Sequence, residues 1–143
     1  MARIFQESRV VAWGECDPAG IIFYPTYYHW MDAAAGSLLA RCGWPAQRMR
    51  DEHLAMPLVD SQCAFVSSPT FGDTCEVRVS VARLGRSSFG LQYEFFLQGQ
   101  DKLLARGSES RVWCRYQAGP GSPLRSLPMP AELRAALGEA PPA

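Results

Sequence analysis

The segment from Trp13 to Pro25 places a single carboxylate, that of Asp17, in a turn just ahead of a long helix. Pro18 and Gly20 interrupt any strand here, because proline lacks the N–H that a strand ladder needs and glycine tolerates a positive φ. Pro25 suits the first turn of a helix, where its missing N–H costs nothing. We therefore expect Asp17 to lie in a turn that faces the N-terminus of the helix.

This arrangement suits acyl-transfer chemistry. An ionised Asp17 can attack a carbonyl carbon as a nucleophile, or it can activate a water molecule as a general base. Backbone N–H groups near Tyr24 carry the positive end of the helix dipole and can donate to an oxyanion as it forms. The alternative is an Asx-turn in which Asp17 only binds its own backbone. Glu15 precedes the turn and is a weaker candidate for a base.

One long helix is predicted from Pro25 to about Cys42. Its apolar residues recur at steps of three and four and give it one buried face. These residues are Tyr28, Met31, Ala35, Leu38, Leu39 and Cys42. Gly43 is a suitable C-cap. Asp32 lies on this helix about two turns beyond Pro25, and one interpretation of it is a carboxylate that simply faces water.

Strand patterns dominate the rest of the chain. A first strand is expected at 5–13 and an irregular link at 48–55, followed by four strands at 57–67, 74–84, 88–97 and 103–116. Short polar turns at 85–87 and 99–101 indicate antiparallel hairpins. A loop at 118–123, a short helix at 131–137 and a frayed end at 141–143 complete the expectation. The order of elements predicts an α+β domain in which a curved sheet wraps around the helix.

Composition limits what the protein can bind. The 143 residues, of which 48% are hydrophobic, fit one domain over 1–143. The net charge is zero, with 14 basic and 14 acidic residues, so no general attraction to nucleic acid or an anionic membrane is expected. No signal core or membrane span is visible, which favours a cytoplasmic protein. The five cysteines are odd in number and far apart, which argues against disulfides and a zinc site and favours reduced, mostly buried thiols.

The motif from Asp17 to Pro25, followed by Tyr27 and by Asp32-Ala33-Ala34, closely resembles the 4-hydroxybenzoyl-CoA thioesterase family of hotdog-fold acyl-CoA thioesterases. The likeness extends over nearly the whole chain. It implies a protomer that pairs its sheet with another in a dimer, usually packed further into a tetramer, with active sites between subunits and no metal or other cofactor. It also implies that Asp17 is the catalytic carboxylate and that the Tyr24 backbone N–H polarises the thioester carbonyl.

The resemblance also suggests residues that bind the substrate. Asp32 would accept a hydrogen bond from a hydroxyl on an aromatic acyl group. Met56 would supply apolar surface at the pocket floor, while Gly20 shapes the turn and Phe23 lines the acyl pocket, for which Trp30, Phe65 and Phe89 are further candidates. Arg86 and Ser88, in a hairpin, would approach the CoA phosphates. Possible supplements, each more often a surface charge, are Arg111, Arg115 and Arg125.

We therefore expect an acyl-CoA thioesterase that hydrolyses its substrate to the free acid and CoA, with 4-hydroxybenzoyl or a related aryl group as the first choice. Short-chain aliphatic acyl-CoA is an alternative, since Met56 favours an apolar group whereas Asp32 favours a hydroxyl. A second alternative is a non-catalytic hotdog module that binds acyl-CoA or an acyl-carrier protein. A dehydratase-type hotdog enzyme would need a histidine in the position filled by the Asp17 turn.

Overall fold

The structure is a computed structural model that describes residues 3–118 and 121–139. Its helices are α1 (Pro25–Arg41), α2 (Ala46–Asp51) and α3 (Ala131–Glu139), with a 3₁₀ turn at Trp13–Glu15. Its strands are β1 (Arg3–Val10), β2 (Leu54–Ala55), β3 (Leu58–Phe65), β4 (Thr74–Leu84), β5 (Ser88–Leu97), β6 (Leu103–Val112), β7 (Cys114–Tyr116) and β8 (Leu124–Ser126). Within the described ranges, no helix has both the length and the apolar character needed to span a membrane.

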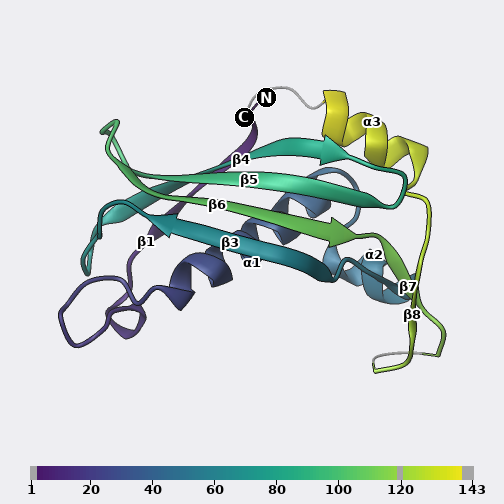
Figure 1. Cartoon of the computed structure of the whole chain (residues 1–143), viewed down its shortest axis with the longest axis horizontal. Helices are drawn as coiled ribbons and strands as arrows, with labels where there is room; N and C mark the ends of the chain where they lie inside the picture. Colours follow the sequence, from purple (N-terminus) through teal and green to yellow (C-terminus); the bar gives the residue numbers. More distant parts are fainter. Residues whose placement is uncertain (1–2, 119–120, 140–143) are drawn as a thin grey trace.

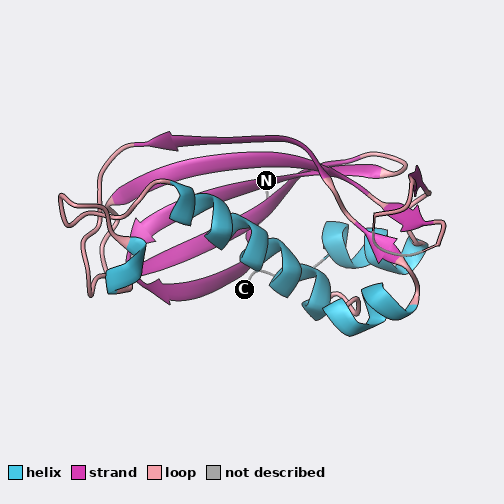
Figure 2. Cartoon of the chain, turned by 90° about the horizontal axis from the view of Figure 1, so that it is seen from below, coloured by secondary structure: helices cyan, strands magenta, loops and turns pink. Residues whose placement is uncertain are grey.

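Five antiparallel strands form one curved sheet in the order β1-β4-β5-β6-β3. A second, small sheet in the order β2-β7-β8 stands at one end of it (Figure 1). Helix α1 runs across a single face of the large sheet (Figure 2), and α3 lies beside the C-terminal end of β4 (Figure 1). This is the predicted α+β arrangement of a curved antiparallel sheet around one long helix.

The core lies between α1 and the sheet. Alternate residues of β4 and β5 point toward the helix and are fully buried, as expected for strands with one covered face. The buried face of α1 consists of Thr26, Tyr27, Trp30, Met31, Ala34, Ala35, Leu38 and Leu39. The predicted face was therefore only partly right: Tyr28 and Cys42 are half-buried, and Tyr27 and Trp30 take the central positions instead.

Strand β6 has an unusual inward face. A Cβ added at Gly107 would lie 2.7 Å from the Sδ of Met31, so α1 packs directly against the backbone of the strand at this point. The next inward residues are Glu109 and Arg111, each only 4% exposed. Two ionisable side chains are thus buried beneath the helix, where charges need partners.

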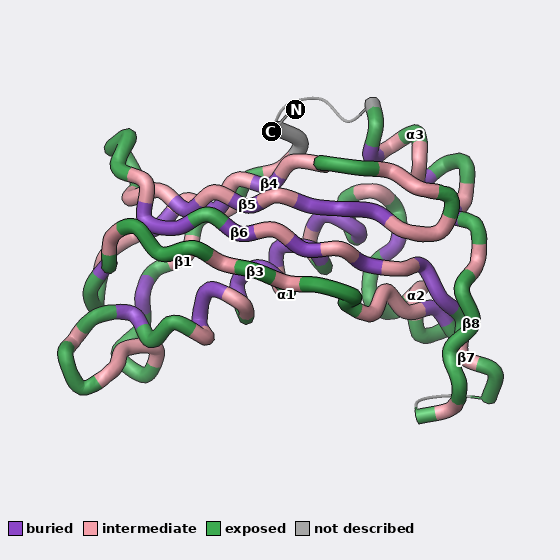
Figure 3. The backbone as a smooth tube through the Cα atoms, viewed as in Figure 1, coloured by how far each residue is buried: buried purple, intermediate pink, exposed green. Residues whose placement is uncertain are grey.

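Strand β3 is one of the two edges of the large sheet, and its outer side is unpaired among the described residues. It is largely exposed along its length (Figure 3). Four apolar residues in β3 or directly after it are about half exposed to solvent or more: Leu58 at 47%, Val59 at 69%, Phe65 at 50% and Val66 at 64%. An exposed apolar edge strand is a ready surface for pairing with another strand.

Several predicted boundaries agree with the structure. Strands 74–84 and 88–97 match β4 and β5, the hairpin turns are confirmed, and both predicted helices are present. The first strand ends at Val10 instead of Trp13, because Trp13 begins the 3₁₀ turn. The link at 48–55 was wrongly predicted to be irregular, since it contains the end of α2 and all of β2.

The last long strand is divided at Trp113, whose N–H donates to the Ser87 carbonyl at 2.6 Å, and the chain continues as β7. Residues 119–120 of the predicted loop and the predicted frayed end at 141–143 lie outside the described residues. The five cysteines are free, as predicted, but only Cys75 and Cys114 are buried.

Candidate active site

The turn at Asp17 is held by its own backbone. Oδ1 of Asp17 accepts the N–H of Ala19 at 2.8 Å and that of Ile21 at 3.4 Å. The Asp17 N–H donates to the Ile21 carbonyl at 2.8 Å, and Gly20 closes the turn with a φ of +79°. This is the geometry of the Asx-turn that the sequence left open. The other carboxylate oxygen, Oδ2, has no hydrogen-bond partner among the described residues, so the turn orients the carboxylate without occupying it.

The first turn of α1 leaves one N–H free. Phe23 donates its N–H to the Glu15 carbonyl at 2.7 Å, and Thr26 donates to the Phe23 carbonyl at 2.9 Å. Pro25 has no N–H to offer. Within the described part of the chain, the Tyr24 N–H therefore has no acceptor. A free N–H at a helix start, at the positive end of its dipole, is suited to binding an oxyanion.

Glu15 fastens this turn to the helix. Its Oε1 accepts the Ala12 N–H at 2.9 Å and its Oε2 accepts Nε1 of Trp30 at 3.2 Å. Its carbonyl also accepts the N–H of Phe23, the residue before Tyr24. Both carboxylate oxygens are thus engaged, which makes Glu15 a structural anchor and a poor base. Sequence reasoning missed this role because the partner on α1 lies 15 residues away.

A second loop supports the turn from the other side. The Thr70 hydroxyl donates to the Gly20 carbonyl at 2.6 Å, and the N–H of Ile22 donates to the Pro69 carbonyl at 3.0 Å. Asp73 stabilises that loop in turn, since its Oδ2 accepts the N–H of Thr70 at 2.9 Å. The position of Gly20 is therefore fixed by contacts from a segment about 50 residues away.

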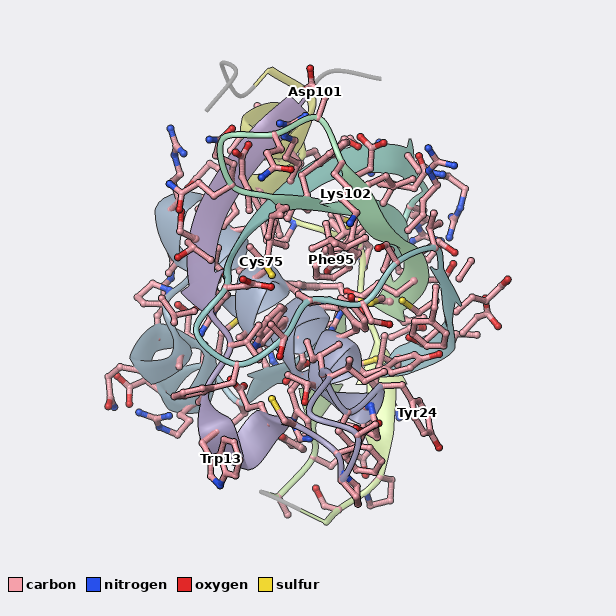
Figure 4. The ribbon with its side chains drawn as sticks, turned by 90° about the vertical axis from the view of Figure 1, so that its left-hand side faces the viewer. Trp13, Tyr24, Cys75, Phe95, Asp101 and Lys102 are labelled. Atoms are coloured by element: carbon pink, nitrogen blue, oxygen red, sulfur yellow. The ribbon has the colours of Figure 1, made fainter. Side chains whose placement is uncertain are left out.

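Aromatic rings surround the free N–H. The Phe23 and Tyr24 rings meet edge-on at 5.4 Å, and Tyr24 meets Phe65 of β3 at 6.1 Å. The Tyr24 side chain points outward, whereas Cys75 and Phe95 lie inside the fold (Figure 4). Phe23 and Phe65 are half exposed at 49% and 50%. Two other aromatics considered for the acyl pocket, Trp30 and Phe89, belong to the core instead.

Asp32 is paired with Arg111. The Nη2 of Arg111 donates to Oδ1 of Asp32 at 2.9 Å, although the Asp32 side chain is 71% exposed and that of Arg111 only 5%. The sequence interpretation of Arg111 as a surface charge near CoA was wrong. An inward position on β6 buries this side chain beneath α1 and makes it unavailable to a phosphate.

A second carboxylate holds the buried guanidinium. Nε and Nη2 of Arg111 donate to the two oxygens of Glu109 at 2.7 and 3.3 Å, and Nη1 donates to the Met56 carbonyl at 3.2 Å. The Tyr93 hydroxyl donates to Glu109 at 2.5 Å. Burial lowers the pKa of Arg111, but the bonds and charges of Glu109 and Asp32 outweigh this and raise it overall. Burial and the Glu109 charge raise the pKa of Tyr93, which stays protonated.

Met56 borders a cavity of about 570 Å³ between α1, α2 and the small sheet. The lining is mostly apolar and consists of Ala33, Gly36, Ser37, Leu39, Ala40, Trp44, Ala46, Met49, Arg50, Leu54, Ala55, Met56 and Tyr116. Asp32 directly precedes Ala33, which lines the cavity. The Arg111 guanidinium donates hydrogen bonds to both Asp32 and the Met56 carbonyl. Its place on α1 is about 12 Å along the helix axis from Tyr24, at 1.5 Å per residue. One protomer thus has two separate groups of predicted site residues.

The hairpin expected to meet CoA pairs with the end of β6, where Ser88 lies opposite Val112, the residue after Arg111. Arg86 is exposed, and its carbonyl accepts the Met129 N–H at 2.9 Å. The Ser88 hydroxyl accepts a hydrogen bond from Nη1 of Arg83 at 2.9 Å.

Two more cations, Arg115 and Arg125, lie directly opposite each other on β7 and β8, beside a hollow of about 330 Å³. Like charges in such a pair favour an anionic ligand.

Comparison with known proteins gives the relationship of the chain. The family model described as the thioesterase-like superfamily matches residues 11–137. The chain belongs to the thioesterase-like superfamily. This thioesterase-like chain is 28% identical over 138 residues to a 4-hydroxybenzoyl-CoA thioesterase from Pseudomonas sp. strain CBS-3, covering 92% of this chain and 96% of that protein. It is 30% identical over 123 residues to a 1,4-dihydroxy-2-naphthoyl-CoA hydrolase from Synechococcus sp. strain CC9311, covering 76% and 81%.

Solved structures agree with this relationship. A gentisyl-coenzyme A thioesterase superposes with a TM-score of 0.78 at 34% identity, covering 94% of this chain and 99% of that one. A variant 4-hydroxybenzoyl-CoA thioesterase in complex with 4-hydroxybenzoyl-CoA gives a TM-score of 0.84 at 27% identity, covering 95% and 99%. The hotdog fold and the family resemblance are confirmed, as is the expectation of a thioester hydrolase.

Proposed function

We propose that this protein hydrolyses acyl-CoA thioesters with Asp17 as the nucleophile or general base and the Tyr24 backbone N–H as the oxyanion donor. The observation that carries the proposal is the free Tyr24 N–H at the start of α1, close in sequence to a carboxylate with one unengaged oxygen. Residues 1–143 act as one catalytic domain in this proposal. Its cytoplasmic location is supported by the five free cysteines.

Two routes use these groups. In the first, an Asp17 oxygen attacks the thioester carbonyl carbon, the carbon–sulfur bond breaks and CoA leaves as the thiolate. Water then hydrolyses the mixed anhydride to the free acid and restores Asp17. In the second, Asp17 takes a proton from a water molecule as that water attacks the same carbon, the carbon–sulfur bond then breaks, and the departing CoA thiolate takes up the proton from Asp17 as the free acid forms. In both, the Tyr24 N–H donates to the oxygen that becomes negative in the transition state.

Self-association would bring the two groups of site residues together. We infer that the exposed edge of β3 pairs with the same strand of a second copy, as an unpaired apolar edge favours. If the two strands run antiparallel about a two-fold axis, the Phe65 end of one lies beside the Leu58 end of the other. Phe65 contacts Tyr24, and Leu58 follows closely on Met56. The Asp17 turn would then face the partner's Met56 and the partner's Asp32, and two such dimers can form a tetramer.

The acyl group that fits best is a hydroxylated aryl group. Asp32 is a highly exposed carboxylate held in place by Arg111, and the next residue, Ala33, lines a mainly apolar cavity. An apolar pocket with one acceptor suits a ring that bears a hydroxyl. The relatives described above are named for 4-hydroxybenzoyl-, 1,4-dihydroxy-2-naphthoyl- and gentisyl-CoA, which supports the same class of substrate.

The remaining site residues keep their proposed roles. Gly20 closes the catalytic turn, and Phe23 with the Tyr24 ring flanks the thioester. Arg86 and Ser88 bind the phosphates of CoA, and the opposed Arg115 and Arg125 supply a further anionic subsite.

A panel of four substrates tests the proposal. Release of the CoA thiol is measured for benzoyl-, 4-hydroxybenzoyl-, phenylacetyl- and butyryl-CoA, and the largest kcat/KM is expected for 4-hydroxybenzoyl-CoA. Turnover of butyryl-CoA alone would refute the aryl assignment and leave the thioesterase intact. Binding of acyl-CoA without any thiol release would refute catalysis and indicate a binding module. Single turnover in labelled water, with a search for label in Asp17, distinguishes the nucleophile from the base.

A further inference from the structure

The most heavily connected ionisable group in the described chain is Arg111. Its guanidinium makes four hydrogen bonds, to both oxygens of Glu109, to the Met56 carbonyl and to Oδ1 of Asp32. These partners lie on three different parts of the fold: Glu109 on β6, Asp32 on α1 and Met56 on the segment between β2 and β3. One side chain therefore connects α1 and the segment before β3 to the large sheet.

The guanidinium is itself fixed from beneath. Glu109 binds it through both oxygens, and the Glu109 side chain is only 2% exposed. A fork-to-fork pair of this kind sets the orientation of the guanidinium as well as its place. The Tyr93 hydroxyl, on β5, binds Glu109 and prevents it from turning away. A continuous hydrogen-bond network thus runs from the buried centre of the sheet to the solvent, through Tyr93, Glu109, Arg111 and Asp32.

We propose that Arg111, oriented by Glu109 and Tyr93, is the positioning residue that holds the Asp32 carboxylate as a hydrogen-bond acceptor and thereby selects acyl groups with a hydrogen-bond donor. The inference rests on the proposed function. Arg111 engages only Oδ1 of Asp32, and no described residue binds Oδ2, so this oxygen is open to a donor on the substrate. One guanidinium between two carboxylates leaves the cluster with a net negative charge, which disfavours an acyl group that carries a carboxylate.

A substitution that removes the planar guanidinium of Arg111 but keeps its positive charge tests this role. Arg111→Lys retains a cation, but an ammonium cannot reproduce the flat fork that reaches Glu109, Met56 and Asp32 together. The wild type should favour 4-hydroxybenzoyl-CoA over benzoyl-CoA in kcat/KM by about 10- to 100-fold, the range for one hydrogen bond to a charged group. In Arg111→Lys this preference should fall to about threefold or less, because kcat/KM should fall more for 4-hydroxybenzoyl-CoA than for benzoyl-CoA.

Two further variants show whether Arg111 acts through Asp32. Asp32→Asn should lose most of the preference by itself, and adding Arg111→Lys to it should change the preference no further, because both act on the same interaction. The matched control is Arg106→Lys, on the same strand, whose guanidinium lies 3.7 Å from the exposed Glu94. It should keep the wild-type preference.

Poor folding of a single variant does not block the test. The triple variant Tyr93→Phe, Glu109→Leu and Arg111→Met removes the whole network without leaving a buried charge, an exchange that proteins often tolerate. It should hydrolyse benzoyl-CoA and show the same loss of preference.

Each result decides the matter. An unchanged preference in Arg111→Lys or in the triple variant would overturn the positioning role. An equal loss of activity toward both substrates in both variants would overturn it too, since that indicates a purely structural residue. A wild type that hydrolyses neither aryl substrate but releases CoA from butyryl-CoA refutes the aryl assignment and this inference with it, and a wild type that releases no thiol from any of the four substrates refutes the proposed function itself. Either outcome is visible before any variant is compared.

Discussion

Asp17 is held by backbone amides two and four residues away, whereas Asp32 is held by an arginine 79 positions along the chain. The first carboxylate gets its orientation from a proline, a glycine and a helix start, and all three are local. The second gets its orientation from the pairing of strands and the packing of a helix on a sheet. The proposed chemistry thus depends on short-range geometry, while the proposed selectivity depends on the whole fold.

The largest effect is expected where a buried charge loses its partner. Arg111→Met should lower the free energy of unfolding by about 3–5 kcal/mol, because Glu109 is then buried and unpaired. Urea unfolding measures this. Arg106→Met, whose partner Glu94 is exposed, should cost less than about 1 kcal/mol. Equal costs for the two variants would contradict the distinction between the buried network and surface pairs.

Substitution of Asp17 should lower the catalytic rate and leave the stability of the fold almost unchanged. Asp17→Asn should lower kcat by about 100-fold or more, equivalent to about 2.7 kcal/mol in the barrier. Unfolding should change by less than about 0.5 kcal/mol, because asparagine can accept the same backbone N–H groups. Asp73→Asn is the matched control, as Asp73 also accepts a turn N–H, that of Thr70. Near-normal thiol release by Asp17→Asn would end the catalytic assignment.

A smaller loss, in the free energy of unfolding, is expected from a substitution at Gly20 in the Asp17 turn. Gly20 has a φ of +79° and no neighbour within 4 Å of an added Cβ, so Gly20→Ala brings backbone strain without a clash. The cost should be about 1–2 kcal/mol in unfolding free energy. Gly14→Ala, which is equally open but has no positive φ, should cost less. If thermal unfolding does not separate the two variants, the turn is less constrained than its φ indicates.

The smallest effect is predicted at the exposed end of the ion pair. Asp32→Asn should change the unfolding free energy by less than about 1 kcal/mol, because the side chain is 71% exposed. The same pair would then be costly to break from the Arg111 side and cheap to break from the Asp32 side. Chemical denaturation of both variants checks this asymmetry. A cost above 2 kcal/mol for Asp32→Asn would show that Asp32 stabilises the fold and does more than face a ligand.

The same division explains what the sequence could predict. The Asp17 turn, the start of α1 at Pro25 and strands β4 and β5 were all readable, since each follows from neighbouring residues and their spacing. Arg111 and Glu109 were not, because charged residues in a strand are ordinarily assigned to the solvent face. Only the register of β6 against β5 reveals that they point inward. Glu15 was missed for the same reason, as its partner Trp30 is reached only after the helix has folded back.

The close approach of Met31 to Gly107 bears on how sequences of this kind can diverge. A side chain at position 107 would require the flexible end of Met31 to move aside or to become shorter, so the two positions are coupled. Asp32 follows directly on Met31, and a shift of the helix at this contact would carry the carboxylate with it. In the proposed function, an exchange at this pair would therefore reach the acyl site through the helix, without any substitution among the residues that touch the substrate.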